Sequence, residues 1–145
     1  DITCTACHTR FDDMNNQRVP DGQLDLRGVP SVEEINHFVS FRELVFEDNL
    51  EFFDDTLGIV TDVLVESEDG VDPVTGDPIL ILVPVPIGSP ATAGSARASD
   101  AFFTPFEPGN THEGWLSDAE LRLVAEWLDI GAQYFNNPFD APIDN

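Results

Sequence analysis

Lysine is absent from this sequence, and six arginines stand against 28 Asp and Glu residues, so that the formal net charge is −22 over 145 residues. A surface this acidic repels phosphate backbones and anionic lipid, which argues against nucleic acid and membrane surfaces as partners. It favours a cationic partner, bound divalent metal or a salty medium that screens self-repulsion. A solvated acidic surface without a dedicated partner is equally compatible with the composition.

Long apolar runs are missing as well. No stretch is long enough to span a bilayer, and no secretory signal is present. The sequence therefore predicts no membrane insertion. Its length is that of one domain, long enough to bury a hydrophobic core.

Cysteine is scarce: the only two, Cys4 and Cys7, fall in the pentapeptide Cys4-Thr5-Ala6-Cys7-His8. No further thiol remains to build a four-cysteine zinc or iron-sulfur site. C-x-x-C-H is the pattern that holds a covalently attached haem, in which each thiol adds to a vinyl group and the histidine reaches the iron. The pattern predicts one haem c bound by Cys4, Cys7 and His8.

Two other uses of C-x-x-C compete with haem attachment. A redox dithiol is expected at a helix start after a buried strand, and only three residues precede Cys4 here. A structural disulfide at this spacing would close a small loop and stabilise little. Because haem attachment takes place outside the cytoplasm, we expect a periplasmic or extracellular protein, seen either after signal removal or as one domain of a longer chain.

Two candidate iron ligands follow the motif. Met14, the only methionine, lies in a turn-rich stretch over 9–30, and six residues from His8 is a short path to the opposite haem face. A gap-filling role suits Met14 better. A capping box of Ser31 and Glu34 predicts a helix from Ser31 to about Glu47. His37 lies inside this helix, where a packed or surface role competes with iron binding.

The middle of the chain predicts β structure. Two β-branched apolar runs, 57–65 and 79–87, flank an acidic turn over 66–78, which indicates a β-hairpin or small sheet inserted over about 57–87. Pro84 and Pro86 suit an edge strand, which could dock another subunit and form a homo-oligomer or filament. Small residues over 88–100 predict a flexible surface loop.

The acidic turn raises a calcium hypothesis, because carboxylates are the oxygen ligands that Ca²⁺ takes. The spacing matches no EF-hand loop, so that a plain solvated turn competes with a Ca²⁺ site. The carboxylates concerned are Glu66, Glu68, Asp69, Asp72 and Asp77.

The last third contains a second capping box, Ser117 with Glu120. Apolar residues then recur at helical spacing, and Gly131 supplies the residue that ends a helix. The apolar positions are Leu121, Val124, Ala125 and Leu128.

Together, the early C-x-x-C-H and the late Leu-Ser-Asp-Ala-Glu-Leu-Arg-Leu-Val-Ala-Glu-Trp-Leu-Asp-Ile-Gly-Ala resemble a class I c-type cytochrome domain of the bacterial secreted mono-haem type. The resemblance implies a mainly α domain, 1–145, around one covalent haem. In that family the distal ligand precedes the final helix and is commonly methionine; the matching position here is His112. The resemblance thus implies bis-histidine ligation by His8 and His112. It covers about 1–14 and 101–135, and the family's helix before the haem motif has no counterpart.

With both axial positions filled, the haem exchanges electrons only, so we expect an electron carrier that serves redox partner proteins, not an enzyme. No catalytic triad, phosphate loop or acid/base pair argues otherwise. Three alternatives stay open: a peroxidase-like haem enzyme with an open distal site, a subunit of a self-assembling extracellular cytochrome filament, and a haem domain of a larger oxidoreductase.

Overall fold

The computed structural model describes residues 2–134 and shows a mixed α/β chain, 26% helix and 24% strand. The mainly α fold that we expected is therefore wrong. The physical reason lies between residues 48 and 87, where the backbone pairs in three two-stranded antiparallel sheets. No helix of the described residues is long and apolar enough to cross a membrane.

The chain forms two compact units, each built from two separate segments. Unit 1 comprises Asp1–Asp25 and Glu47–Gly88, and unit 2 comprises Leu26–Phe46 and Ser89–Asn145. Unit 1 contains α1 (Ile2–Thr5), the 3-10 turn η1 (Asp21–Gln23), β1 (Asp48–Asn49), β2 (Glu51–Asp54), β3 (Ile59–Asp62), β4 (Leu64–Val71), β5 (Pro78–Pro84) and β6 (Pro86–Ile87). Unit 2 contains α2 (Val39–Val45), η2 (Ala96–Ala98), α3 (Asp100–Phe103), η3 (Thr104–Phe106) and α4 (Asp118–Asp129).

The three sheets of unit 1 meet at a ring of three backbone hydrogen bonds. The amide of Leu50 donates to the carbonyl of Val85 (2.8 Å), Val85 donates to Val63 (2.9 Å), and Val63 donates to Leu50 (2.8 Å). Each of these residues separates two strands, so that β1 pairs with β6, β2 with β3, and β4 with β5. The ring thus ties the ends of all three sheets to one point.

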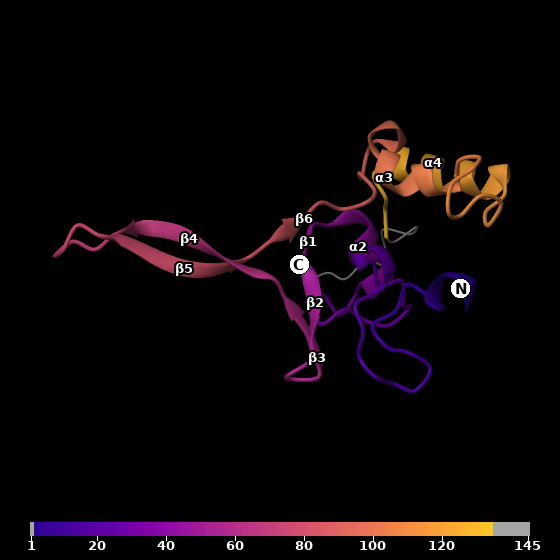
Figure 1. The fold of residues 1–145 in the computed structure, drawn as a ribbon. Coiled ribbons are helices and arrows are strands. Elements are labelled where there is room, and N and C mark those ends of the chain that lie inside the picture. Colours follow the sequence, from indigo (N-terminus) through magenta and orange to yellow (C-terminus); the bar gives the residue numbers. More distant parts are fainter. Residues whose placement is uncertain (1, 135–145) are drawn as a thin grey trace. The chain divides into compact units, whose positions relative to one another are not determined.

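The expected β-hairpin is present with different bounds. Each expected strand is divided at a valine of the ring, so that β4 and β5 form the hairpin while β3 and β6 pair elsewhere. β4 and β5 run side by side as a two-stranded ribbon (Figure 1). Its turn is closed by the Asp72 carboxylate, which accepts hydrogen bonds from the amides of Val74 (2.7 Å) and Thr75 (3.1 Å).

Unit 2 is organised on α4, whose predicted cap and apolar face are confirmed. Ser117 accepts a hydrogen bond from the Glu120 amide, and the Glu120 side chain accepts one from the Ser117 amide. Gly131 follows the helix with φ at +96°. Leu128 is fully buried against Ala91 and Ala132, and the partly buried side chains around this core are Val45, Ala96, Phe102, Phe103, Val124 and Trp127.

The helix expected from Ser31 to about Glu47 is wrong in its first half, because only α2 is helical there. Backbone pairing across the segment replaces the first two turns: Ser31 donates to the His37 carbonyl (2.8 Å), and Pro30 and Phe38 form an antiparallel bridge. The segment is thereby closed into a loop. Val32, next to Ser31 in this loop, is fully exposed at 103%.

Residues 89–100 of the segment expected as a flexible surface loop belong to unit 2, and two of them are buried there. Ala91 and Ser99 are buried, and the Ala91 amide donates to the carbonyl of Leu44 (3.0 Å). The Ala96 amide donates to the Asp129 carboxylate at the end of α4 (2.8 Å). Small side chains allow the backbone to approach α2 and α4 closely, which the sequence alone does not distinguish from flexibility.

We predict that Leu128→Ala lowers the free energy of unfolding by about 2–5 kcal/mol, since it opens a cavity at the fully buried position of α4. Leu123→Ala in the same helix is the matched control, because Leu123 is 67% exposed, and its effect should stay within about 0.5 kcal/mol. Urea unfolding measures both. Equal effects of the two substitutions would contradict this core.

Candidate functional site

The Cys4–His8 segment forms one tight turn at the end of α1. The amides of Cys7 and His8 both donate to the carbonyl of Cys4, at 3.3 and 3.0 Å. Positions i, i+3 and i+4 of such a turn face the same side, so Cys4, Cys7 and His8 share one side of it. Both cysteines are half-buried free thiols, and Nδ1 of His8 is buried. Two free thiols and an imidazole on one side of a turn fit the donor set that a covalent haem requires.

Arg18 holds this turn from the loop that follows it. Its guanidinium donates to the carbonyls of Ala6 (2.7 Å), Cys7 (2.9 Å) and Thr9 (3.1 Å). An arginine side chain near the end of a helical turn is well suited to bond to the last carbonyls. The amides of Thr9 (3.1 Å) and Asp21 (3.3 Å) also donate to the carbonyl of Cys7.

A second set of contacts ties this loop to β2. The side chain of Gln23 bonds to both backbone groups of Glu51: its amide nitrogen donates to the carbonyl (3.0 Å), and its oxygen accepts from the N–H (2.7 Å). Arg10 forms an ion pair with the Glu51 carboxylate. The turn, its loop and the sheet of unit 1 are thereby joined by side-chain contacts.

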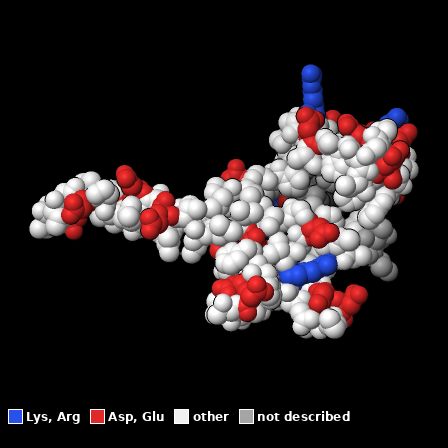
Figure 2. All heavy atoms as spheres, viewed as in Figure 1, with Lys and Arg blue, Asp and Glu red and all other residues white. Residues whose placement is uncertain are grey.

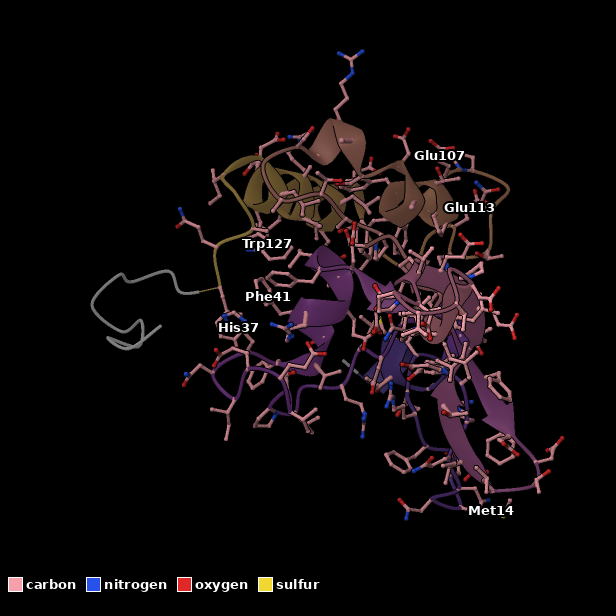
Figure 3. The ribbon with its side chains drawn as sticks, turned by 90° about the vertical axis from the view of Figure 1, so that its left-hand side faces the viewer. Met14, His37, Phe41, Glu107, Glu113 and Trp127 are labelled. Atoms are coloured by element: carbon pink, nitrogen blue, oxygen red, sulfur yellow. The ribbon has the colours of Figure 1, made fainter. Side chains whose placement is uncertain are left out.

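Met14 lies at the tip of the loop after the motif (Figure 3) and is 80% exposed. The tip is shaped by Asp12, whose carboxylate accepts hydrogen bonds from the amides of Met14 (2.9 Å) and Asn16 (2.8 Å). Hydrogen bonds from the side chain and backbone of Asn16 lower the pKa of Asp12 below 3.8. Met14 fills no gap in the described structure.

His112 lies half-buried in the loop between η3 and α4 of unit 2. Its ring packs against Phe106 (centroids 5.5 Å apart) and edge-on against Trp115 (4.9 Å). The Thr111 hydroxyl lies 3.0 Å from its Nδ1, and its backbone N–H donates to the carbonyl of Pro105 (2.8 Å). These contacts fix the orientation of both the imidazole ring and the backbone of His112.

His37 also belongs to unit 2 but lies in a separate aromatic cluster. Its ring centroid is 4.9 Å from Phe41 and 4.7 Å from Tyr134, and Phe41 in turn meets Trp127 edge-on. Figure 3 shows His37, Phe41 and Trp127 in succession. Nδ1 of His37 is buried among these aromatic rings. This matches the packed role that competes with iron binding for this residue.

The structure thus brings Cys4, Cys7 and His8 together in unit 1, and His37 and His112 belong to unit 2. Among the described residues, no group of three or more His, Cys, Asp or Glu side chains could hold a bare metal ion. In the acidic turn considered for Ca²⁺, Asp72 is engaged by the backbone of the hairpin loop.

Arg18 is the functional residue that sequence analysis missed. A signal was available, because three of the six arginines of the sequence lie in the turn-rich stretch 9–30 that follows the motif, and Arg18 is one of them. What the sequence could not show is that the loop turns back so that one side chain reaches three carbonyls.

No protein-family model, no curated protein sequence and no solved structure matches this chain.

We predict that Arg18→Gln loosens the motif turn, because a shorter neutral side chain cannot satisfy three carbonyls. Amide hydrogen exchange at His8, whose N–H bonds to the Cys4 carbonyl, should become about 10-fold faster, in line with a loss of about 1.5 kcal/mol. Arg122→Gln, an exposed arginine of α4, is the control and should leave His8 unchanged. Unaltered exchange in Arg18→Gln would refute this role.

The pKa of Glu51 is raised above 4.5, because burial of the carboxyl outweighs the attraction of Arg10. The folded state then binds this proton more tightly than the unfolded chain, so the free energy of unfolding decreases as pH rises from 4.5 through the folded-state pKa. We predict that Glu51→Gln removes this part of the pH dependence, measured by urea unfolding over a series of pH values. An unchanged slope in the variant would contradict the assignment.

Proposed function

We propose that this protein is an exported mono-haem c-type cytochrome that carries electrons and is not an enzyme. The observation that carries the proposal is the motif turn, in which the amides of Cys7 and His8 both bond to the Cys4 carbonyl, the two thiols are free and Arg18 holds the backbone. Redox pairs and structural disulfides use C-x-x-C without an adjoining histidine, so His8 at this position favours haem.

The roles of the residues follow from their chemistry. Cys4 and Cys7 would each add across a vinyl group: the S–H bond and the vinyl double bond break, sulfur bonds to one vinyl carbon, and the hydrogen bonds to the other. His8 would bind the iron on the same side. A bound haem supplies a one-electron Fe(III)/Fe(II) couple. Arg18 fixes the backbone of the turn and thereby the direction of both thiols and the imidazole.

We assign the second iron ligand to His112, on the basis of the family resemblance. The Thr111 hydroxyl at Nδ1 supports this assignment, because a partner at one ring nitrogen orients the imidazole for metal binding through the other. His37, among aromatic rings, and Met14, exposed at a loop tip, are the runners-up. Two imidazoles would leave no position for substrate and would give a lower potential than a His/Met pair.

The acidic surface suggests the partners. Figure 2 shows acidic side chains distributed over the face in view with few basic ones, in agreement with the net charge of −22. Such a surface attracts cationic redox proteins at low ionic strength. We place the protein in the periplasm or outside the cell, where haem attachment occurs, and propose that it also forms homo-oligomers through its β region.

The test is spectroscopy of the protein matured in a host that attaches haem c. We expect haem that survives denaturation, and a low-spin spectrum without the thioether–iron charge-transfer band that added carbon monoxide does not change. His112→Ala should bind carbon monoxide, because the iron would lose the ligand assigned to His112. His37→Ala is the matched control within unit 2 and should keep the low-spin spectrum.

Each alternative has its own signature in this experiment. The variants Cys4→Ser and Cys7→Ser should release haem on denaturation. If the parent protein releases haem as well, covalent attachment is overturned. Carbon monoxide binding by the parent protein would replace the carrier with a haem enzyme. An open site in His37→Ala and not in His112→Ala would move the second ligand to His37.

A further inference from the structure

Strand β5 is the most apolar exposed element of the described structure. Residues 78–96 contain no ionisable side chain, and this is the longest such stretch in the sequence. β5 occupies its beginning, and its side chains are exposed on both faces: Ile79 41%, Leu80 57%, Ile81 39% and Leu82 63%. Strands apolar on both faces are normally covered on both. Its partner β4 is different, because it carries Glu66, Glu68 and Asp69.

Within residues 2–134 the backbone of β5 has one open edge, since its sheet contains only β4 and β5. Hydrogen-bonded and non-hydrogen-bonded positions alternate along an antiparallel ladder. The Val85 amide donates to the Val63 carbonyl opposite it, so the backbone N–H and C=O groups of Val83 and Ile81 also point toward β4. Leu80 and Leu82 therefore point their N–H and C=O groups away from β4, toward the open edge.

Prolines close this edge at both ends. Pro78 and Pro84 fall on the outward-pointing positions and have no N–H to donate. Between them the strand reads Pro-Ile-Leu-Ile-Leu-Val-Pro, which is nearly palindromic about Ile81. The donors and acceptors of the open edge are thus arranged symmetrically about one residue.

We propose that β5 pairs antiparallel with β5 of a second copy of this chain, about a two-fold axis at Ile81. In this register Leu80 of one copy faces Leu82 of the other, and the two pairs exchange four backbone hydrogen bonds. Pro78 of one copy then faces Pro84 of the other, so that no amide at the ends of the ladder loses its partner. A two-stranded sheet, marginal by itself, becomes four-stranded.

The symmetry of the open edge favours a second copy as the occupant, because another β5 presents the same proline-bounded pattern of donors and acceptors. Two chains of −22 repel each other, and β5 lies in the longest stretch without ionisable side chains, so that contact through β5 adds no carboxylate of this stretch to the interface. The outer edges of the resulting sheet are the two β4 strands, on which Glu66 and Glu68 oppose further pairing. The assembly closes as a dimer, and added salt should strengthen it by screening the repulsion.

The experiment measures self-association by sedimentation equilibrium at low and high salt. Leu82→Pro removes an N–H that points to the open edge and leaves the β4–β5 ladder intact, so the dimer dissociation constant should rise at least about 10-fold. Glu66→Pro is the matched control: Glu66 faces Leu82 across the hairpin, and its N–H points to the other edge. Its dissociation constant should stay within about 3-fold of the parent value.

A second variant guards against local unfolding. Leu80→Glu keeps every backbone donor and, at a position 57% exposed in the single chain, sets a carboxylate against the other copy, so it should also prevent dimers. A monomeric parent protein at high salt, dimers weakened by salt, or equal loss in Leu82→Pro and Glu66→Pro would each overturn the proposal. Haem absorbance of the same samples tests the proposed function separately.

Discussion

Unit 1 depends on the ring of backbone hydrogen bonds among Leu50, Val63 and Val85. None of its two-stranded sheets is expected to be stable alone, since a single hairpin buries too little apolar surface to offset the entropy of ordering its backbone. The ring fixes one end of each sheet to the other two, which makes their formation interdependent. The hairpin β4–β5 can extend from this point because its base is held on two sides.

The shortage of positive charge shapes how the remaining contacts are made. Arg18 is used on three backbone carbonyls, Arg10 on Glu51, and Arg42 on Glu33 while it lies 4.8 Å above the ring of Phe46. These arginines serve local geometry, and the excess of carboxylates remains unneutralised. A surface left so acidic limits contact between copies to uncharged segments, and the same acidity would attract a cationic redox partner.

The candidate site shows how far residue patterns reach. The candidate residues Cys4, Cys7 and His8 could be named from the sequence alone, because the amides of Cys7 and His8 bond within the turn itself. Arg18 could not be assigned in this way, since its role arises only when the loop after the motif turns back. His112 was reached by resemblance alone, and its aromatic neighbours Phe106 and Trp115 come from the fold of unit 2.

The sequence by itself determined the elements whose bonds are local. The helix α4 was predictable because its cap, its apolar face and Gly131 act within a few residues, and the hairpin because its turn closes on Asp72. Tertiary structure decided the rest. Ser31 and Glu34 form a capping pattern, yet pairing of Pro30 with Phe38 overrides it, and the ring at Val63 and Val85 divides strands that read as continuous. A local pattern cannot show which distant backbone will compete for the same donors and acceptors, and that competition selects the fold.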